Sequence, residues 1–251
     1  MGTADIAASL NAAGLAAARS DAARDAAKME AARDWRGLAA TRRRQGEFAR
    51  AAGALDEGEG HLRAALSLYV MLEDGYQAGR VLASLAEIRL ALGDAQGAAD
   101  LSRQAADRVP GDTEALTVLA YAEWAAGSAS DAEVTFSEAL RWDADAALAL
   151  SGRGQVRAGR GSYDAALDDL DRALKLGLDK AAEAEACSAR ALALAGLGRA
   201  GDALAELERS APESPRARLW AERTRGLAGS SGEAPHGDAA GSAGEGGESR
   251  S

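Results

Sequence analysis

The chain has 251 residues, with 39 Asp and Glu against 29 Lys and Arg, and a single cysteine. Aromatic residues make up 4% and only 4 prolines occur, while alanine is abundant; this composition disfavours a β-rich domain and favours closely packed helices. The net charge of −10 disfavours nucleic acid as a partner, because phosphate backbones attract clustered Lys and Arg. With Cys187 alone, an intramolecular disulfide is excluded.

Residues 1–44 are predicted to form an alanine-rich helical cap, with Trp35 and Leu38 as its main apolar anchors. Asp5 stands where a signal peptide carries Arg or Lys before an apolar run, so we expect no secretion signal. No charge-free stretch reaches the roughly 18–20 apolar residues that a membrane-spanning helix needs. The sequence therefore predicts a cytoplasmic protein that does not contact a membrane.

A repeat of 34 residues follows this segment. Gly127 is followed five positions later by Ala132, and Gly161 is followed in the same way by Ala166. The step from Ala98 to Ala132 and on to Ala166 is 34 residues each time. Allowing for a three-residue insertion near 181–183, this grid predicts five units: 45–78, 79–112, 113–146, 147–180 and 184–217.

Each unit is long enough for two helices of about 13–14 residues joined by short turns. A glycine between the helices suits the left-handed residue that closes a helix. Small residues spaced seven apart flatten one face of the second helix, so that the first helix lies close against it. Neither helix buries its apolar stripe alone, and stacking of neighbouring units creates the core.

The repeats resemble tetratricopeptide repeats (TPRs). That family has a large apolar residue at position 4 of each unit, small residues at positions 8, 20 and 27, and glycine at position 15. Unit 79–112 supplies Leu82, Ala86, Gly93, Ala98 and Ala105 at these places. The resemblance implies an all-α, right-handed superhelical solenoid of about five helix-turn-helix repeats with helical caps.

Some positions depart from the family pattern. Position 11, usually apolar, carries Arg89, Glu123 and Arg157 in successive units, and one hypothesis is an alternating ladder of charges between stacked helices. Unit 45–78 has Glu59 at the expected turn, and unit 184–217 has Arg190 where leucine is expected. These departures make the two outer units the most irregular ones.

The chain ends in two segments of different character. Residues 215–228 are predicted to form a capping helix that begins at Pro215, with Leu219 and Trp220 covering the exposed edge of the last repeat. Residues 229–251 are rich in Gly, Ser and Glu and are predicted to be a disordered tail, because they have nothing to bury.

No catalytic group of residues is evident. Neither of the two histidines has a partner at metal-ligand spacing, and no phosphate-binding glycine loop occurs. Cys187 occupies a packing position, which favours a buried thiol over a reactive thiolate. Asp168, Asp169 and Asp171 are interpreted as a solvated outer face in preference to a metal site. We therefore expect a protein that is not an enzyme, with no cofactor and no metal.

The resemblance implies a concave groove lined by the first helix of each unit. The candidate groove residues are Arg80, Glu87, Tyr121, Trp124, Ser151 and Gln155. Tyr121 and Trp124 lie one helical turn apart beside small residues. Either they form a hot spot for an apolar segment of a partner, or they fill the gap to the neighbouring helix.

The resulting functional hypothesis is a scaffold or adaptor that binds a segment of another protein in the groove of the array. A second hypothesis, from a different class, is a structural role in which copies of the chain self-assemble through an exposed end. A third, less favoured, is an accessory subunit that senses a small ligand, for which the sequence offers no enclosed polar site.

Overall fold

The computed structural model describes residues 12–210 and 214–230, so most of the predicted tail 229–251 and the first eleven residues of the predicted cap lie outside the described part. Within these ranges the chain is helical throughout and contains no strand. The helices are α2 (Ala12–Ala31), α3 (Trp35–Ala51), α4 (Leu55–Met71), α5 (Gly75–Ala91), α6 (Ala95–Arg108), α7 (Thr113–Ala125), α8 (Ala129–Trp142), α9 (Ala147–Arg160), α10 (Tyr163–Leu176), α11 (Lys180–Gly196), α12 (Ala200–Ser210) and α13 (Pro215–Ser230). None of these described helices is both long and apolar enough to cross a bilayer.

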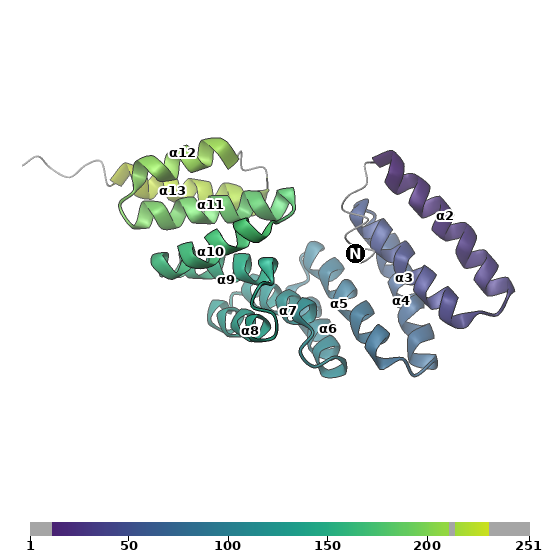
Figure 1. The fold of residues 1–251 in the computed structure, drawn as a ribbon. Coiled ribbons are helices and arrows are strands. Elements are labelled where there is room, and N and C mark those ends of the chain that lie inside the picture. Colours follow the sequence, from purple (N-terminus) through teal and green to yellow (C-terminus); the bar gives the residue numbers. More distant parts are fainter. Residues whose placement is uncertain (1–11, 211–213, 231–251) are drawn as a thin grey trace, which may run out of the picture.

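Five consecutive helix pairs, from α3–α4 to α11–α12, stack into an extended array (Figure 1). Helix α2 packs against α3 at one end, and α13 lies against α11 and α12 at the other. The predicted all-α solenoid of about five helix-turn-helix repeats is confirmed.

Turn and cap residues set the ends of the helices. Each hairpin turn contains a glycine with φ between 76° and 91°, and these residues are Gly53, Gly93, Gly127, Gly161 and Gly198. Five helices begin after an aspartate whose carboxylate accepts a hydrogen bond from a backbone N–H of the first turn, at 2.8–3.2 Å. These residues are Asp34, Asp74, Asp94, Asp112 and Asp179. Local chemistry therefore fixes where most hairpins start and turn.

Pairs of small residues bring the two helices of each hairpin together. Ala120 on α7 and Ala132 on α8 are fully buried and stand twelve residues apart. In the first hairpin, both equivalent positions are glycine, and a Cβ added to Gly58 would lie 3.1 Å from the carbonyl oxygen of Gly46. Larger side chains such as Phe136 fill the spaces between hairpins and are fully buried there.

The first hairpin differs from the predicted unit 45–78. Helix α3 begins at Trp35, so a boundary at residue 45 falls inside it, and Glu59 lies within α4 and not at the turn. The turn is at Gly53, which precedes Gly93 by 40 positions instead of 34. The reason is that α4 and α5, which lie between these two glycines, have 17 residues each, about one helical turn more than the 13 or 14 of α7 to α10.

Candidate functional site

The first helices of neighbouring hairpins pack against one another, as α3 on α5, α5 on α7, α7 on α9 and α9 on α11. Each second helix packs instead against the first helices of its own and the following hairpin. The first helices therefore line the inner side of the curved array. We call the surface that they form the inner face.

The N-terminal half of the inner face is charged. Arg50 on α3 pairs with Glu87 on α5 at 3.0 Å, and Arg80 on α5 pairs with Glu114 on α7 at 3.1 Å. Burial raises the pKa of Glu87 to about 7, against the opposing effect of Arg50, and it also raises the pKa of Glu114. The predicted groove residues Arg80 and Glu87 are thus held in ion pairs that join neighbouring hairpins.

The C-terminal half of the inner face carries aromatic rings. Tyr121 meets Phe136 edge to face, with ring centroids 5.0 Å apart, and its hydroxyl donates a hydrogen bond to the carbonyl oxygen of Leu148 at 3.3 Å. Trp124 stacks on Trp220 of α13, with centroids 6.0 Å apart and planes inclined by 23°. In the folded chain both rings therefore pack against neighbouring helices, Tyr121 against α8 and α9 and Trp124 against α13.

Two arginines of α13 add polar contacts to this stack. The guanidinium of Arg216 lies 4.7 Å from the ring centroid of Trp124, within cation–π range, and 3.4 Å from a carboxylate oxygen of Glu185. Arg223 lies over the ring of Trp220 at 5.2 Å and donates a hydrogen bond to the carbonyl oxygen of Gly159 at 3.3 Å. Trp220 thus packs against α11 of the last repeat, as expected, and also reaches back to the third hairpin, whereas Leu219, expected to cover the same edge, is exposed.

Ser151 and Gln155, the other two predicted groove residues, do not line an open surface. Both lie on α9 between α7 and α11 and are at most 1% exposed. The Gln155 amide donates a hydrogen bond to the Ser151 hydroxyl at 3.0 Å, and Gln155 Oε1 is buried without a partner. They are hidden because the first helices of the third to fifth hairpins approach one another closely.

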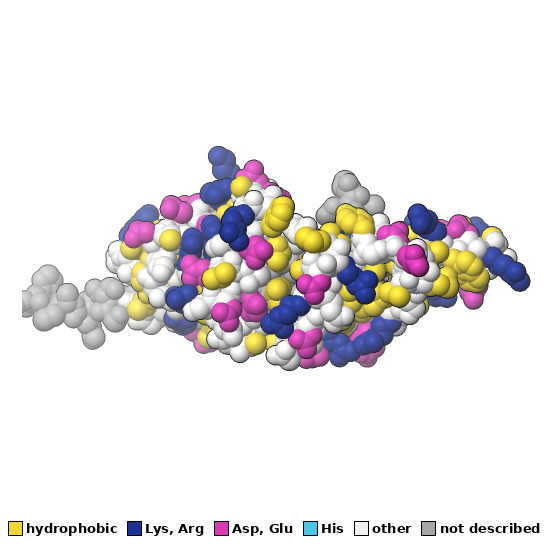
Figure 2. All heavy atoms as spheres, turned by 90° about the horizontal axis from the view of Figure 1, so that it is seen from below, with side chains coloured by type: hydrophobic (Ala, Val, Ile, Leu, Met, Phe, Trp, Pro, Cys, Tyr) yellow, Lys and Arg dark blue, Asp and Glu magenta, His cyan; other side chains and the backbone are white. Residues whose placement is uncertain are grey.

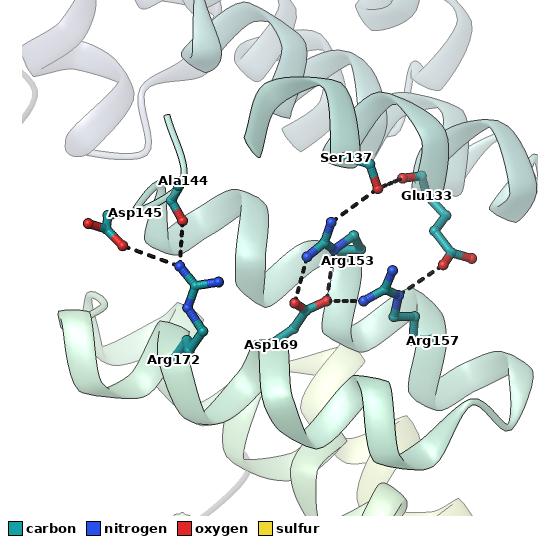
Figure 3. Close-up of polar contacts among 8 residues, drawn as sticks. All are labelled: Glu133, Ser137, Ala144, Asp145, Arg153, Arg157, Asp169 and Arg172. Carbon is teal, nitrogen blue, oxygen red and sulfur yellow. Dashed lines mark hydrogen bonds and ion pairs between the residues drawn. The ribbon is translucent and has the colours of Figure 1, made fainter. Parts of the chain in front are cut away.

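On the side of the second helices, a network of charges joins α8, α9 and α10 (Figure 3). Arg153 holds Asp169 through two hydrogen bonds, of 2.8 and 2.7 Å, and Arg157 bonds to Asp169 at 2.8 Å and to Glu133 at 2.9 Å. Asp169 is only 3% exposed, so its interpretation as part of a solvated face was wrong, although Asp168 is exposed as expected. In this part of the chain, Asp169 is a buried structural anion paired with two guanidinium groups.

The charged residues at position 11 do not form a ladder. Arg89 pairs with Glu59 on α4, and Glu123 accepts a hydrogen bond from the Thr135 hydroxyl at 2.8 Å. Arg157 bonds to the second helices, as described above. The ladder hypothesis was wrong because position 11 faces the second helices and not the first helix of the next unit.

Two further titratable groups, Cys187 and His61, have shifted pKa values. Cys187 is half-buried and not fully buried as expected, and burial together with the neighbouring Glu206 carboxylate raises the pKa of its thiol to about 11, so the thiol is protonated at neutral pH. His61 lies in a polar hollow of about 320 Å³ between α2, α3 and α4, which sequence reasoning did not find. Burial lowers the pKa of His61. Among the described residues, no group of three or more His, Cys, Asp or Glu is arranged to hold a metal ion.

The stacked helix pairs and the inner face place the chain in the class of all-α helical-repeat proteins. Residues 89–155 match the family model described as tetratricopeptide repeat, which confirms the resemblance to the TPR family. No curated protein sequence matches the chain.

Solved structures agree on the fold. A thermophilic TPR protein of Thermus thermophilus is 24% identical, with a TM-score of 0.56, over 75% of this chain and 98% of its own. BtubC (BKLC) from P. vanneervenii is 17% identical, with a TM-score of 0.64, over 82% of this chain and 91% of its own. At these identities the likeness concerns the fold.

Proposed function

We propose that the chain is a non-enzymatic protein-interaction scaffold that binds a segment of a partner protein on its inner face. TPR proteins generally mediate protein–protein interactions and are typically not catalytic.

The observation that carries the proposal is the way in which the inner face holds α13. An amphipathic helix lies along α11 and places its aromatic residue on Trp124. Recognition of an amphipathic helix in an apolar groove is a recurring mode of protein binding. A surface that buries one such helix has the shape and the apolar character to bind another.

Charged residues beside this surface supply specificity. The pairs Arg50–Glu87 and Arg80–Glu114 lie next to the aromatic half, where a partner's own charges would meet them. Figure 2 shows one face of the molecule, on which acidic and basic side chains are interspersed along the array. Such mixed charges discriminate between partners and steer encounter more than they raise affinity.

The test is co-purification with the tagged full-length chain from its own cells, followed by mass spectrometry. Partners recovered with the wild type should be lost with Tyr121→Ala/Trp124→Ala or with Arg80→Ala/Glu87→Ala. They should be retained with Val134→Ala, which changes an exposed residue of the second helix α8. Circular dichroism checks that each variant is folded.

Two outcomes contradict the proposal. If partners remain bound to both inner-face variants, binding takes place elsewhere on the array. If only the chain itself is recovered and its mass in solution rises with concentration, self-assembly replaces the scaffold role.

A further inference from the structure

Helix α13 is an amphipathic helix whose apolar stripe faces the array. Ala217, Trp220, Ala221 and Thr224 are at most 3% exposed and follow the helical spacing of three and four residues. The residues between them, such as Leu219, are exposed. The helix therefore has one buried side and one solvated side, as a helical ligand has when it lies in a groove.

Helix α13 is placed differently from α5, α7, α9 and α11, the other helices that follow a completed hairpin. Each of α5, α7, α9 and α11 packs more extensively against the second helix just before it than against the preceding first helix. In α13 this order is reversed, because it packs mainly against α11 and less against α12. Helix α13 is thus displaced from the next position of the solenoid toward the inner face.

Arg216 and Trp220, four positions apart on α13, make the contacts of this helix that reach furthest back along the chain. Trp220 fits between Trp124 and Gly159, and a Cβ added to Gly159 would lie 3.0 Å from the Trp220 ring. Arg216 lies over Trp124 and beside Glu185. The recognised pattern is therefore an arginine followed four residues later by a tryptophan, with small residues beside the ring.

The fit of α13 is incomplete. The indole Nε1 of Trp220 is buried without a hydrogen-bond partner, and so is Oε1 of Gln155 on α9. A buried donor without an acceptor weakens docking. An isolated helix of this length is marginal in water, so α13 relies on the array for its own structure and on its covalent link for a high local concentration.

We propose that the face formed by α7, α9 and α11 is a receptor for an amphipathic helix of a partner protein that carries Arg and Trp four residues apart, and that α13 occupies this receptor in cis until the partner's helix replaces it. The inference rests on the proposed function and names the chemistry of the partner. It also assigns α13 a regulatory role. A partner helix can bind only while α13 is undocked, so its apparent affinity equals its intrinsic affinity multiplied by the fraction of molecules in which α13 is undocked.

The test uses a fluorescein-labelled peptide with the sequence of residues 214–230 as the probe for this receptor. We expect it to bind the full-length Trp220→Ala chain at least ten times more tightly than the wild-type chain, since the variant weakens the cis competitor. In the peptide, Arg216→Ala and Trp220→Ala should each weaken binding at least tenfold. Leu219→Ala is the matched control, because Leu219 is exposed, and should leave affinity unchanged. In the chain, Gly159→Leu added to Trp220→Ala should abolish binding, because its side chain fills the tryptophan slot.

A second measurement on the wild-type chain guards against a variant that fails to fold. Hydrogen exchange of residues 215–230 should accelerate when excess unlabelled peptide is added, while that of α11 should not. Unchanged exchange at saturating peptide, or equal affinity of the peptide for both chains, overturns the inference. A concentration-dependent dimer that exchanges α13 between copies also overturns it, because the occupant is then a second copy of this chain.

These outcomes are distinct from failure of the proposed function. If co-purification depends on Arg80 and Glu87 but the peptide never displaces α13, the scaffold proposal stands and the cis-ligand inference falls. If no partner is recovered whose binding depends on residues of the inner face, the scaffold proposal fails, whatever the result of the peptide experiment.

Discussion

The two halves of the inner face are built on the same helical scaffold but present different chemistry. In the N-terminal half, Glu87 and its neighbours form ion pairs between hairpins, and none of the described helices lies across them. In the C-terminal half, the equivalent position of the next unit is Tyr121, and the surface is apolar and covered by α13. At this repeat position a carboxylate joins two hairpins in the charged half, whereas in the covered half an aromatic ring lies beneath Arg216 of the docked helix.

The largest expected effect on stability is in the charge network around Asp169, which joins α8, α9 and α10 on the side of the second helices. Asp169→Ala leaves Arg153 and Arg157 without their buried partner, and removal of one member of a buried ion pair costs about 3–5 kcal/mol. Urea denaturation should show this loss in the free energy of unfolding. Asp168→Ala is the control and should change it by less than about 0.5 kcal/mol. Equal effects of the two changes would mean that Asp169 is not anchored.

Trp220→Ala should have the next largest effect and should be confined to the C-terminal half. The variant removes a ring that is 3% exposed and stacked on Trp124, which corresponds to about 2–4 kcal/mol of lost packing. Hydrogen exchange should show faster exchange in α13 and unchanged exchange in α3 to α6. A uniform loss of protection along the whole array would contradict this separation of the two halves.

The stability of the charged N-terminal half should depend on pH. The pKa of Glu87 is raised from 4.5 to about 7 in the folded chain, so the native state binds this proton more tightly than the unfolded state does. Stability contributed by the protonated carboxyl is therefore lost as pH rises from about 4.5 to 7. Glu87→Gln should raise the free energy of unfolding by about 1 kcal/mol at pH 8 and leave it nearly unchanged near pH 4.5.

Glu59→Gln is the matched control of opposite sign. Hydrogen bonding from Arg63, with the charge of Arg89, lowers the pKa of Glu59, so this carboxylate stabilises the native state above pH 4.5 and loses that contribution as pH falls. The glutamine variant should therefore be less stable than the wild type at pH 8. Thermal melts of both variants at pH 5 and pH 8 provide the measurement, and parallel shifts would refute the assignment.

The smallest effect is expected for Arg80→Ala. The pair Arg80–Glu114 is about two-fifths exposed on each side, and exposed ion pairs contribute about 0–1 kcal/mol. A change in melting temperature of no more than a few degrees is expected. A large loss of stability would show that the open half of the inner face is held together by its charges and is not free to bind.

Local signals in the sequence were sufficient for most of the fold. Gly93, Gly127 and Gly161 mark turns because a positive φ favours glycine, and these glycines lie where the repeat grid placed the turns. The grid failed in the first hairpin, where Gly58 and Gly60 stand near the expected turn. The added helical turn in α4 and in α5 moves the true turn back to Gly53, and repeat spacing carries no information on these added turns.

The site was harder to predict because it depends on contacts between distant segments. Tyr121 and Trp124 were found from their place in the repeat, yet the covering of Trp124 by α13 joins residues nearly a hundred positions apart. The burial of Gln155 depends on how closely neighbouring first helices pack, and repeat position alone does not give that distance. The buried state of Asp169 follows from Arg153, which stands where units 79–112 and 113–146 have leucine, and repeat position alone does not pair the two residues.

The stacked indoles also give the molecule an optical reporter of its own. Trp124 and Trp220 lie close enough for their electronic transitions to couple, whereas Trp35 and Trp142, the other two of the 4 tryptophans, are 41% and 63% exposed. Undocking of α13 should separate the coupled pair and transfer Trp220 from a buried environment to water. The unlabelled chain should then report its own opening, through a weaker exciton signal in circular dichroism and a red shift of its fluorescence.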